Sequence, residues 1–143
     1  MLQYKNHRFH CSGISFEIPD GYFLDTDCDS YDNSIWLYPA NRSIHILIEV
    51  HDSCDGARIE LERICKDKYV GSVDSFAPVT TNGLEGFMAN YRYVREPNYE
   101  VWLDISDGCA LSVSFADRGN GTHINMETLV ETLDIRRETQ TSK

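Results

Sequence analysis

Aspartates at alternate positions are the first residues whose spacing could support chemistry. Asp25, Asp27 and Asp29 have the spacing with which an EF-hand calcium loop begins. That loop also requires Gly at its sixth position and Glu at its twelfth, where this chain has Ser30 and Trp36. The pattern therefore favours a solvated acidic loop, although further oxygen ligands nearby leave a hard-cation site open.

Histidines and cysteines form two more clusters of metal-ligating side chains. His7, His10 and Cys11 could supply three zinc ligands, and His51 lies close in sequence to Cys54. Neither cluster has the paired spacing of a structural zinc site. The sequence therefore predicts no metal and no other cofactor.

Nucleophilic catalysis would require a thiol or hydroxyl beside a histidine. The sequence contains no Gly-x-Ser-x-Gly elbow, no phosphate-binding loop and no dinucleotide fingerprint. Cys54 or Cys109 could pair with a histidine in a thiol enzyme or a small hydrolase, but no convergent acid–base pair is evident. Buried cysteines more often act as small hydrophobes, so we favour a protein that is not an enzyme and keep the enzyme as the alternative.

Composition and charge restrict the partners. The 143 residues are the size of one domain, and 13 Lys and Arg against 23 Asp and Glu give a net charge of −10. This charge argues against nucleic acid and anionic membranes, which attract basic patches, but it permits an immunity-type inhibitor of a basic partner. The sequence has no apolar run long enough for a membrane span and no signal-peptide core, so we expect a cytoplasmic location unless a leader was removed. The five cysteines have no Cys-x-x-Cys spacing, and we expect them to be reduced thiols.

The hydrophobic pattern predicts the elements that would position a site. Apolar residues alternate with period two along most of the chain, and two segments have helical periodicity. We predict an α+β domain spanning residues 1–143, with a single antiparallel sheet of about six to seven strands flanked by helices. The predicted strands are 14–18, 35–38, 43–50, 74–81, 84–95, 99–106 and 109–117; one helix follows the potential N-caps Asp52, Ser53 and Asp55, a second is capped by Asn125, and 136–143 form a polar tail.

One face of this sheet carries the candidate binding site. Leu103 and its alternate neighbours are assigned to the core, so Trp102 faces the other way. A tryptophan beside small and apolar residues is typical of a shallow platform for a partner, unless a helix of the same chain covers it. The candidate binding residues are Trp102, Arg92, Met88, His45, Leu47, Ser112 and Ser114, and Trp36 and Tyr38 could join them.

The element order and one turn carry a resemblance to a known superfamily. The opening strand ends in Pro19-Asp20-Gly21-Tyr22, and a helix, a four-strand meander and a final helix follow. This order resembles the superfamily of the photosystem II PsbP subunit and the Ran-release nuclear import factor (PsbP/Mog-like), which includes the Eag-type secretion chaperones. The resemblance implies an antiparallel sheet with helices on its faces and a mostly non-enzymatic role in binding proteins, with small ligands as a further class. We therefore expect a non-catalytic module that binds a protein segment or a small apolar ligand on the sheet face.

Overall fold

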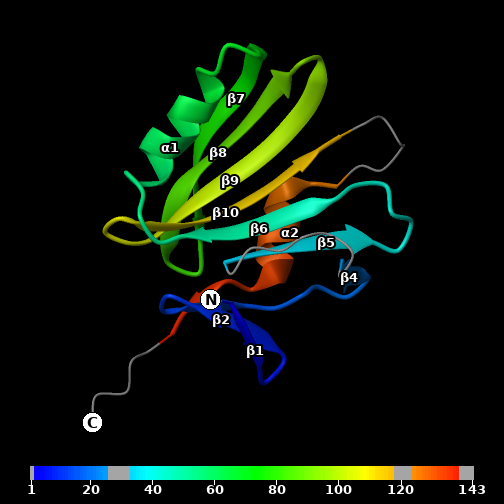
Figure 1. Cartoon of the computed structure of the whole chain (residues 1–143), viewed down its shortest axis with the longest axis vertical. Helices are drawn as coiled ribbons and strands as arrows, with labels where there is room; N and C mark the ends of the chain where they lie inside the picture. The colour runs from blue at the N-terminus through cyan, green and yellow to red at the C-terminus, as the bar shows by residue number, and fades with distance from the viewer. Residues whose placement is uncertain (1, 26–32, 118–123, 139–143) are drawn as a thin grey trace.

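Two antiparallel sheets and two helices make up the protein in the computed structural model, which describes residues 2–25, 33–117 and 124–138 (Figure 1). The larger sheet has seven strands in the order β4-β5-β6-β10-β9-β8-β7, and the smaller has four in the order β1-β2-β3-β11. The predicted α+β class and antiparallel sheet are confirmed, while the smaller sheet was not predicted. The strands are β1 (Gln3–Lys5), β2 (Arg8–Cys11), β3 (Ile14–Phe16), β4 (Tyr22–Leu24), β5 (Ser34–Pro39), β6 (Ile46–His51), β7 (Val70–Thr81), β8 (Leu84–Tyr93), β9 (Glu96–Ser106), β10 (Cys109–Ala116) and β11 (Arg136–Arg137).

The two helices lie on opposite faces of the seven-stranded sheet (Figure 1). Helix α2 (Met126–Leu133) packs with the smaller sheet against one face and forms the main core, in which Leu103, Leu111 and Leu129 are almost fully buried. Helix α1 (Ala57–Cys65) packs on β8 and β9 over the other face. Neither helix is long and apolar enough to span a membrane, as far as the described residues show.

The helix starts follow different rules. Asn125 caps α2 as predicted, because its side chain accepts a hydrogen bond of 3.1 Å from the Thr128 N–H. The predicted cap of α1 is wrong, since Gly56 holds that position without a side-chain hydrogen bond. Asp104 of β9 instead accepts the Ala57 N–H at 2.9 Å, so a strand distant in sequence satisfies the free amide and fixes the helix against the sheet.

The β8–β9 turn differs from the prediction and changes which face β8 presents. The sequence favoured a turn at Glu96-Pro97-Asn98, but the strands are joined at Val94 and Arg95, whose φ angles are 47° and 73°. Phe87 consequently pairs with Trp102, whereas the predicted turn would have placed Arg92 there. The two residues are an odd number of positions apart, so the whole of β8 is turned over relative to the prediction.

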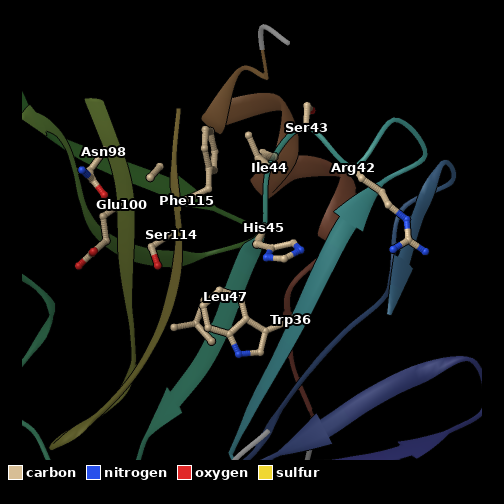
Figure 2. Close-up of a pocket in the computed structure, with 11 residues that line it drawn as sticks. Trp36, Arg42, Ser43, Ile44, His45, Leu47, Asn98, Glu100, Ser114 and Phe115 are labelled. Atoms are coloured by element: carbon tan, nitrogen blue, oxygen red, sulfur yellow. The ribbon is translucent and has the colours of Figure 1, made fainter. Parts of the chain in front are cut away.

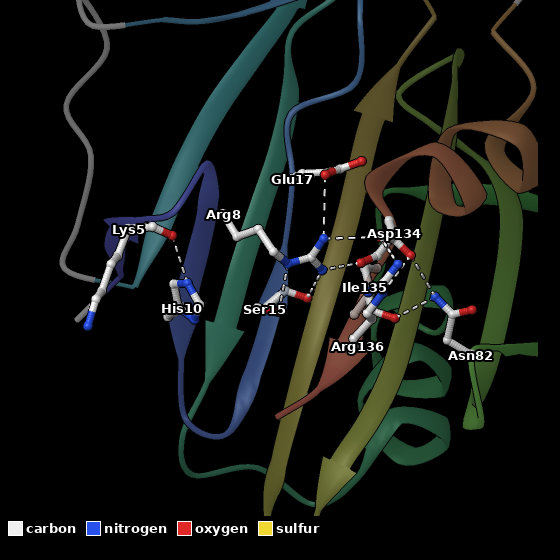
Figure 3. A network of polar contacts seen from close by, with 9 residues as sticks. All are labelled: Lys5, Arg8, His10, Ser15, Glu17, Asn82, Asp134, Ile135 and Arg136. Atoms are coloured by element: carbon white, nitrogen blue, oxygen red, sulfur yellow. Dashed lines mark hydrogen bonds and ion pairs between the residues drawn. The ribbon is translucent and has the colours of Figure 1, made fainter. Parts of the chain in front are cut away.

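A partly buried arginine joins the smaller sheet to the end of α2 (Figure 3). Arg8 donates to the Ser15 hydroxyl at 2.9 Å and to Oδ2 of Asp134 at 3.0 Å, and it also contacts the Asp134 carbonyl. Asp134 has the left-handed conformation (φ 49°) with which the helix ends. Residues 136 and 137 then pair with β3 as β11, so the predicted polar tail begins later than expected, and residues 139–143 lie outside the described residues.

Candidate functional site

Helix α1 covers only part of its sheet face. Trp102 lies beneath it with Leu61, Ala89 and Ala110, and only 6% of the tryptophan is exposed. The expectation of an exposed platform around Trp102 is therefore wrong, and the alternative of a covering helix holds. The part of this face formed by β5, β6 and β10 makes few contacts with α1, so the helix leaves it uncovered (Figure 1).

The open part forms a groove of about 400 Å³, which we call the sheet-face groove (Figure 2). Its floor is one row of cross-strand partners in register: Trp36 on β5, Leu47 on β6, Ser114 on β10 and Glu100 on β9. Figure 2 shows Trp36 and Glu100 at opposite sides of the groove, with Leu47 and Ser114 between them. The groove is completed by Arg42, Ser43, Ile44, His45, Asn98, Phe115 and Ala116.

Three of the seven predicted binding residues, His45, Leu47 and Ser114, line this groove together. Ser112 belongs to the neighbouring row with Trp102 and is buried. The prediction of which side chains of β6, β9 and β10 face this side of the sheet was therefore correct.

Met88 and Arg92 are not part of this face. Because β8 is turned over, Met88 pairs with Val101 and packs against the main core on the α2 side. Arg92 follows it on the same side and forms an exposed ion pair with Asp74 at 3.9 Å. Their assignment to the Trp102 face is corrected by the position of the β8–β9 turn.

Glu100 is the charged group at the boundary between the groove and the core under α1. Its carboxylate accepts hydrogen bonds from Trp102 Nε1 at 2.7 Å and from the Tyr91 hydroxyl at 3.2 Å. Burial raises the pKa of this carboxyl above its usual range, and the two hydrogen bonds offset only part of that rise. The same surroundings raise the pKa of Tyr91, again mainly through burial, so that the hydroxyl stays a donor.

His51 and Ser112 form the nearest arrangement to a nucleophile and base. His51 Nε2 lies 2.9 Å from the Ser112 hydroxyl, and its ring stacks on Trp102 at 4.2 Å between centroids. Burial lowers the pKa of His51 despite the nearby acids. Glu49, however, contacts the same ring nitrogen at 3.6 Å rather than orienting the imidazole through Nδ1, and the serine is buried. The pair therefore acts as a polar contact within the sheet.

Two of the thiols, Cys65 and Cys109, have surroundings that suppress the thiolate. Burial raises the pKa of Cys109, and Asp52 raises it further, while burial and Glu100 do the same for Cys65. Reactive cysteines need the opposite, an electropositive neighbourhood. No disulfide joins Cys11, Cys54, Cys65 and Cys109, the four cysteines within the described ranges.

The candidate metal clusters do not assemble within the described residues. His10 contacts Glu138 and the Lys5 carbonyl, and no group of three or more potential ligands converges in the part of the chain that the structure describes. In the aspartate-rich loop, Asp25 approaches His45 Nε2 at 3.4 Å. The rest of that loop, including Asp27 and Asp29, lies outside the described residues.

Two of the four residues that form the groove floor were missing from the predicted set. Trp36 was only a possible addition, because the sequence did not settle the register of β5 against β6. Glu100 was placed on the correct face but not selected, although an acid that alternates with buried Val101 and precedes Trp102 by two positions was a usable signal. Its burial depends on α1 and β8, which no local pattern places.

Comparison with known proteins supports the fold at low sequence identity. No protein-family model matches the sequence, and no curated protein matches it. The solution structure of cyanobacterial PsbP (CyanoP) from Synechocystis sp. PCC 6803 is similar with a TM-score of 0.56 and 13% identity, over 95% of this chain and 92% of that one. A crystal structure from Bacteroides thetaiotaomicron VPI-5482 is similar with a TM-score of 0.53 and 13% identity, over 90% of this chain but 46% of the other. The chain therefore has the PsbP-like fold that its element order resembles.

Proposed function

We propose that this protein is a non-catalytic binding module whose sheet-face groove receives an extended segment of a partner protein. The observation that carries the proposal is the open row from Trp36 to Glu100, which α1 leaves uncovered beside a fully packed core. The volume of about 400 Å³ lies in the range of ligand sites. Its lining alternates apolar side chains with hydroxyl, amide and charged groups, which suits a peptide better than an apolar small molecule.

The low reactivity of the polar groups nearby supports binding over catalysis. The buried Ser112 is paired with His51, and the pKa values of Cys65 and Cys109 are raised. None of these residues lines the sheet-face groove, and its described lining contains no cysteine. We therefore infer that the groove offers contact surface rather than an activated nucleophile.

A peptide selection followed by NMR mapping tests this proposal. Peptides selected from a random library on the intact protein are titrated into isotope-labelled protein. We expect the largest signal changes at the Trp36 indole and at the Leu47 and Ser114 amides, since these groups form the groove floor. Changes centred on another surface would overturn the proposal.

Matched variants extend the same test. Leu47→Ser removes apolar contact from the groove and is expected to weaken peptide binding at least tenfold. Ile59→Ser makes the same kind of change on the exposed surface of α1 and is expected to leave binding unchanged. Equal effects of the two variants would contradict a site in the groove.

A further inference from the structure

Glu100 is a partly buried acid without a cationic partner among the described residues. Its two oxygens accept hydrogen bonds from Trp102 and Tyr91, both neutral donors. A carboxylate offers about four acceptor positions, so room for further donors remains. Buried charges in proteins are normally paired, and an unpaired one at the side of a groove is costly for the fold alone.

The cations that line the groove with Glu100 are engaged elsewhere. Arg42 lies over the Tyr38 ring, 4.6 Å from its centroid, and Figure 2 shows its guanidinium directed away from the floor. His45 approaches Asp25 at 3.4 Å. The charge of another acid, Glu49, raises the pKa of Glu100 further. The local charge is therefore complementary to a positive group brought by a ligand.

We propose that the partner segment places a lysine or arginine side chain against Glu100 while an apolar residue of the same segment packs on Trp36 and Leu47. This inference rests on the proposed function, because it assumes that a peptide occupies the sheet-face groove. The net charge of −10 favours the approach of such a basic segment. Within the groove, Glu100 adds selectivity to this general attraction, since it can hydrogen-bond the cationic group directly.

The register of the sheet sets the spacing of the two recognised residues. Trp36 and Glu100 are separated by three strand-to-strand steps of about 4.8 Å each, which is about 14 Å. An extended peptide advances about 3.3 Å per residue, so it covers this distance in about four residues. Because the long basic side chain itself covers part of the distance, we expect the apolar residue about two to four positions from the lysine or arginine.

The experiment compares an arginine peptide with its neutral isostere on charge-matched variants. From the selected peptides, one with an essential arginine is resynthesised with citrulline, which keeps the shape and loses the charge. We expect citrulline to weaken binding to the wild-type protein at least tenfold and binding to Glu100→Gln less than twofold. Glu131→Gln, which removes the same charge from the exposed surface of α2, is expected to behave like the wild type.

The outcomes separate this inference from the proposed function. Peptides that shift the groove signals without a requirement for lysine or arginine would overturn the inference and leave the proposed function standing. A citrulline penalty of equal size in the wild type and Glu100→Gln would also overturn it, because the attraction would then come from overall charge. Peptides that do not shift the groove signals would overturn both.

Discussion

On β9, the Trp102 indole Nε1 donates a hydrogen bond of 2.7 Å to Oε2 of Glu100. Residues two positions apart on a strand share a face, so this contact connects the core beneath α1 with the floor of the sheet-face groove. The Tyr91 hydroxyl on β8 holds the other oxygen at 3.2 Å. Glu100 is thus fixed by two residues of the packed core while it lines the open groove, an arrangement that suits a preformed binding site.

Substitution of Trp102 should destabilise the protein as strongly as substitution of its neighbour Leu103. Both side chains are buried, one under α1 and the other in the main core, so Trp102→Ala and Leu103→Ala should each cost about 3–5 kcal/mol. Urea unfolding measures both values. Trp36→Ala is the control, since this partly exposed tryptophan should cost clearly less. A cost for Trp102→Ala near zero would contradict its burial.

Glu100 should make the free energy of unfolding fall as the pH rises. Its pKa is raised by burial in the folded protein, so between the ordinary value of 4.5 and the raised value the folded state holds the proton more strongly than the unfolded state. Below pH 4.5 Glu100 is protonated in both the folded and the unfolded state, so it no longer makes the free energy of unfolding depend on pH. Glu100→Gln should therefore gain stability relative to the wild type from pH 4.5 upward, by about 1.4 kcal/mol for each pH unit between the two pKa values. Unfolding curves at several pH values test this, and parallel profiles for the two proteins would refute it.

The sequence was informative wherever alternation is local. The residues that β6, β9 and β10 present on the α1 face follow from period-two patterning alone, and this placed Leu47 and Ser114 correctly. The C-terminal helix and its Asn125 cap were predictable for the same reason, because a capping residue and an apolar stripe lie within a few positions of each other.

The failures arose where a distant part of the chain determines the outcome. Val94 is β-branched and has a positive φ, so nothing in its residue type indicates the turn that inverts β8. The position of α1 over Trp102 depends on Asp104, a residue of β9 that accepts the first helical N–H. Neither the position of this turn nor the hydrogen bond to Asp104 can be recognised from the neighbouring residues in the sequence.

Removal of Arg8 should weaken the attachment of the smaller sheet to α2. Its hydrogen bonds to Ser15 and Asp134 are partly buried, and bonds to charged groups contribute about 1.5–3 kcal/mol, so Arg8→Met should cost about 2–4 kcal/mol. Arg58→Met is the control, because the exposed pair of Arg58 with Glu62 contributes only about 0.5 kcal/mol. Similar losses in the two variants would contradict a structural role for Arg8.

The same substitution should change the titration of Asp134. Burial raises the pKa of this carboxyl, but hydrogen bonds and charges from Arg136 and Arg8 outweigh burial and hold the pKa below its usual range. A lowered pKa stabilises the fold above the unfolded-state pKa, and this stability is lost as the pH falls through the folded-state pKa. In Arg8→Met the pKa should rise, and the acid-induced loss of stability from this group should shrink. NMR titration of the Asp134 carboxyl measures the change, and an unaltered pKa would show that Arg136 alone is sufficient.

The strained β8–β9 turn offers a route to a more stable protein. Val94 and Arg95 both have positive φ angles, which cost residues other than glycine and asparagine about 1–2 kcal/mol each. Val94 is 62% exposed, so its replacement would remove little packing. Val94→Asn combined with Arg95→Gly supplies the preferred residues of a type I′ hairpin turn and should raise the free energy of unfolding by about 1–2 kcal/mol. The Asn82-Gly83 turn provides the opposite case, since Gly83→Ala forces a side chain onto a φ of 79° and should lower stability by about 1 kcal/mol. Urea unfolding of the two variants checks both signs, and a double variant less stable than the wild type would mean that the native turn is favoured by contacts other than its backbone conformation.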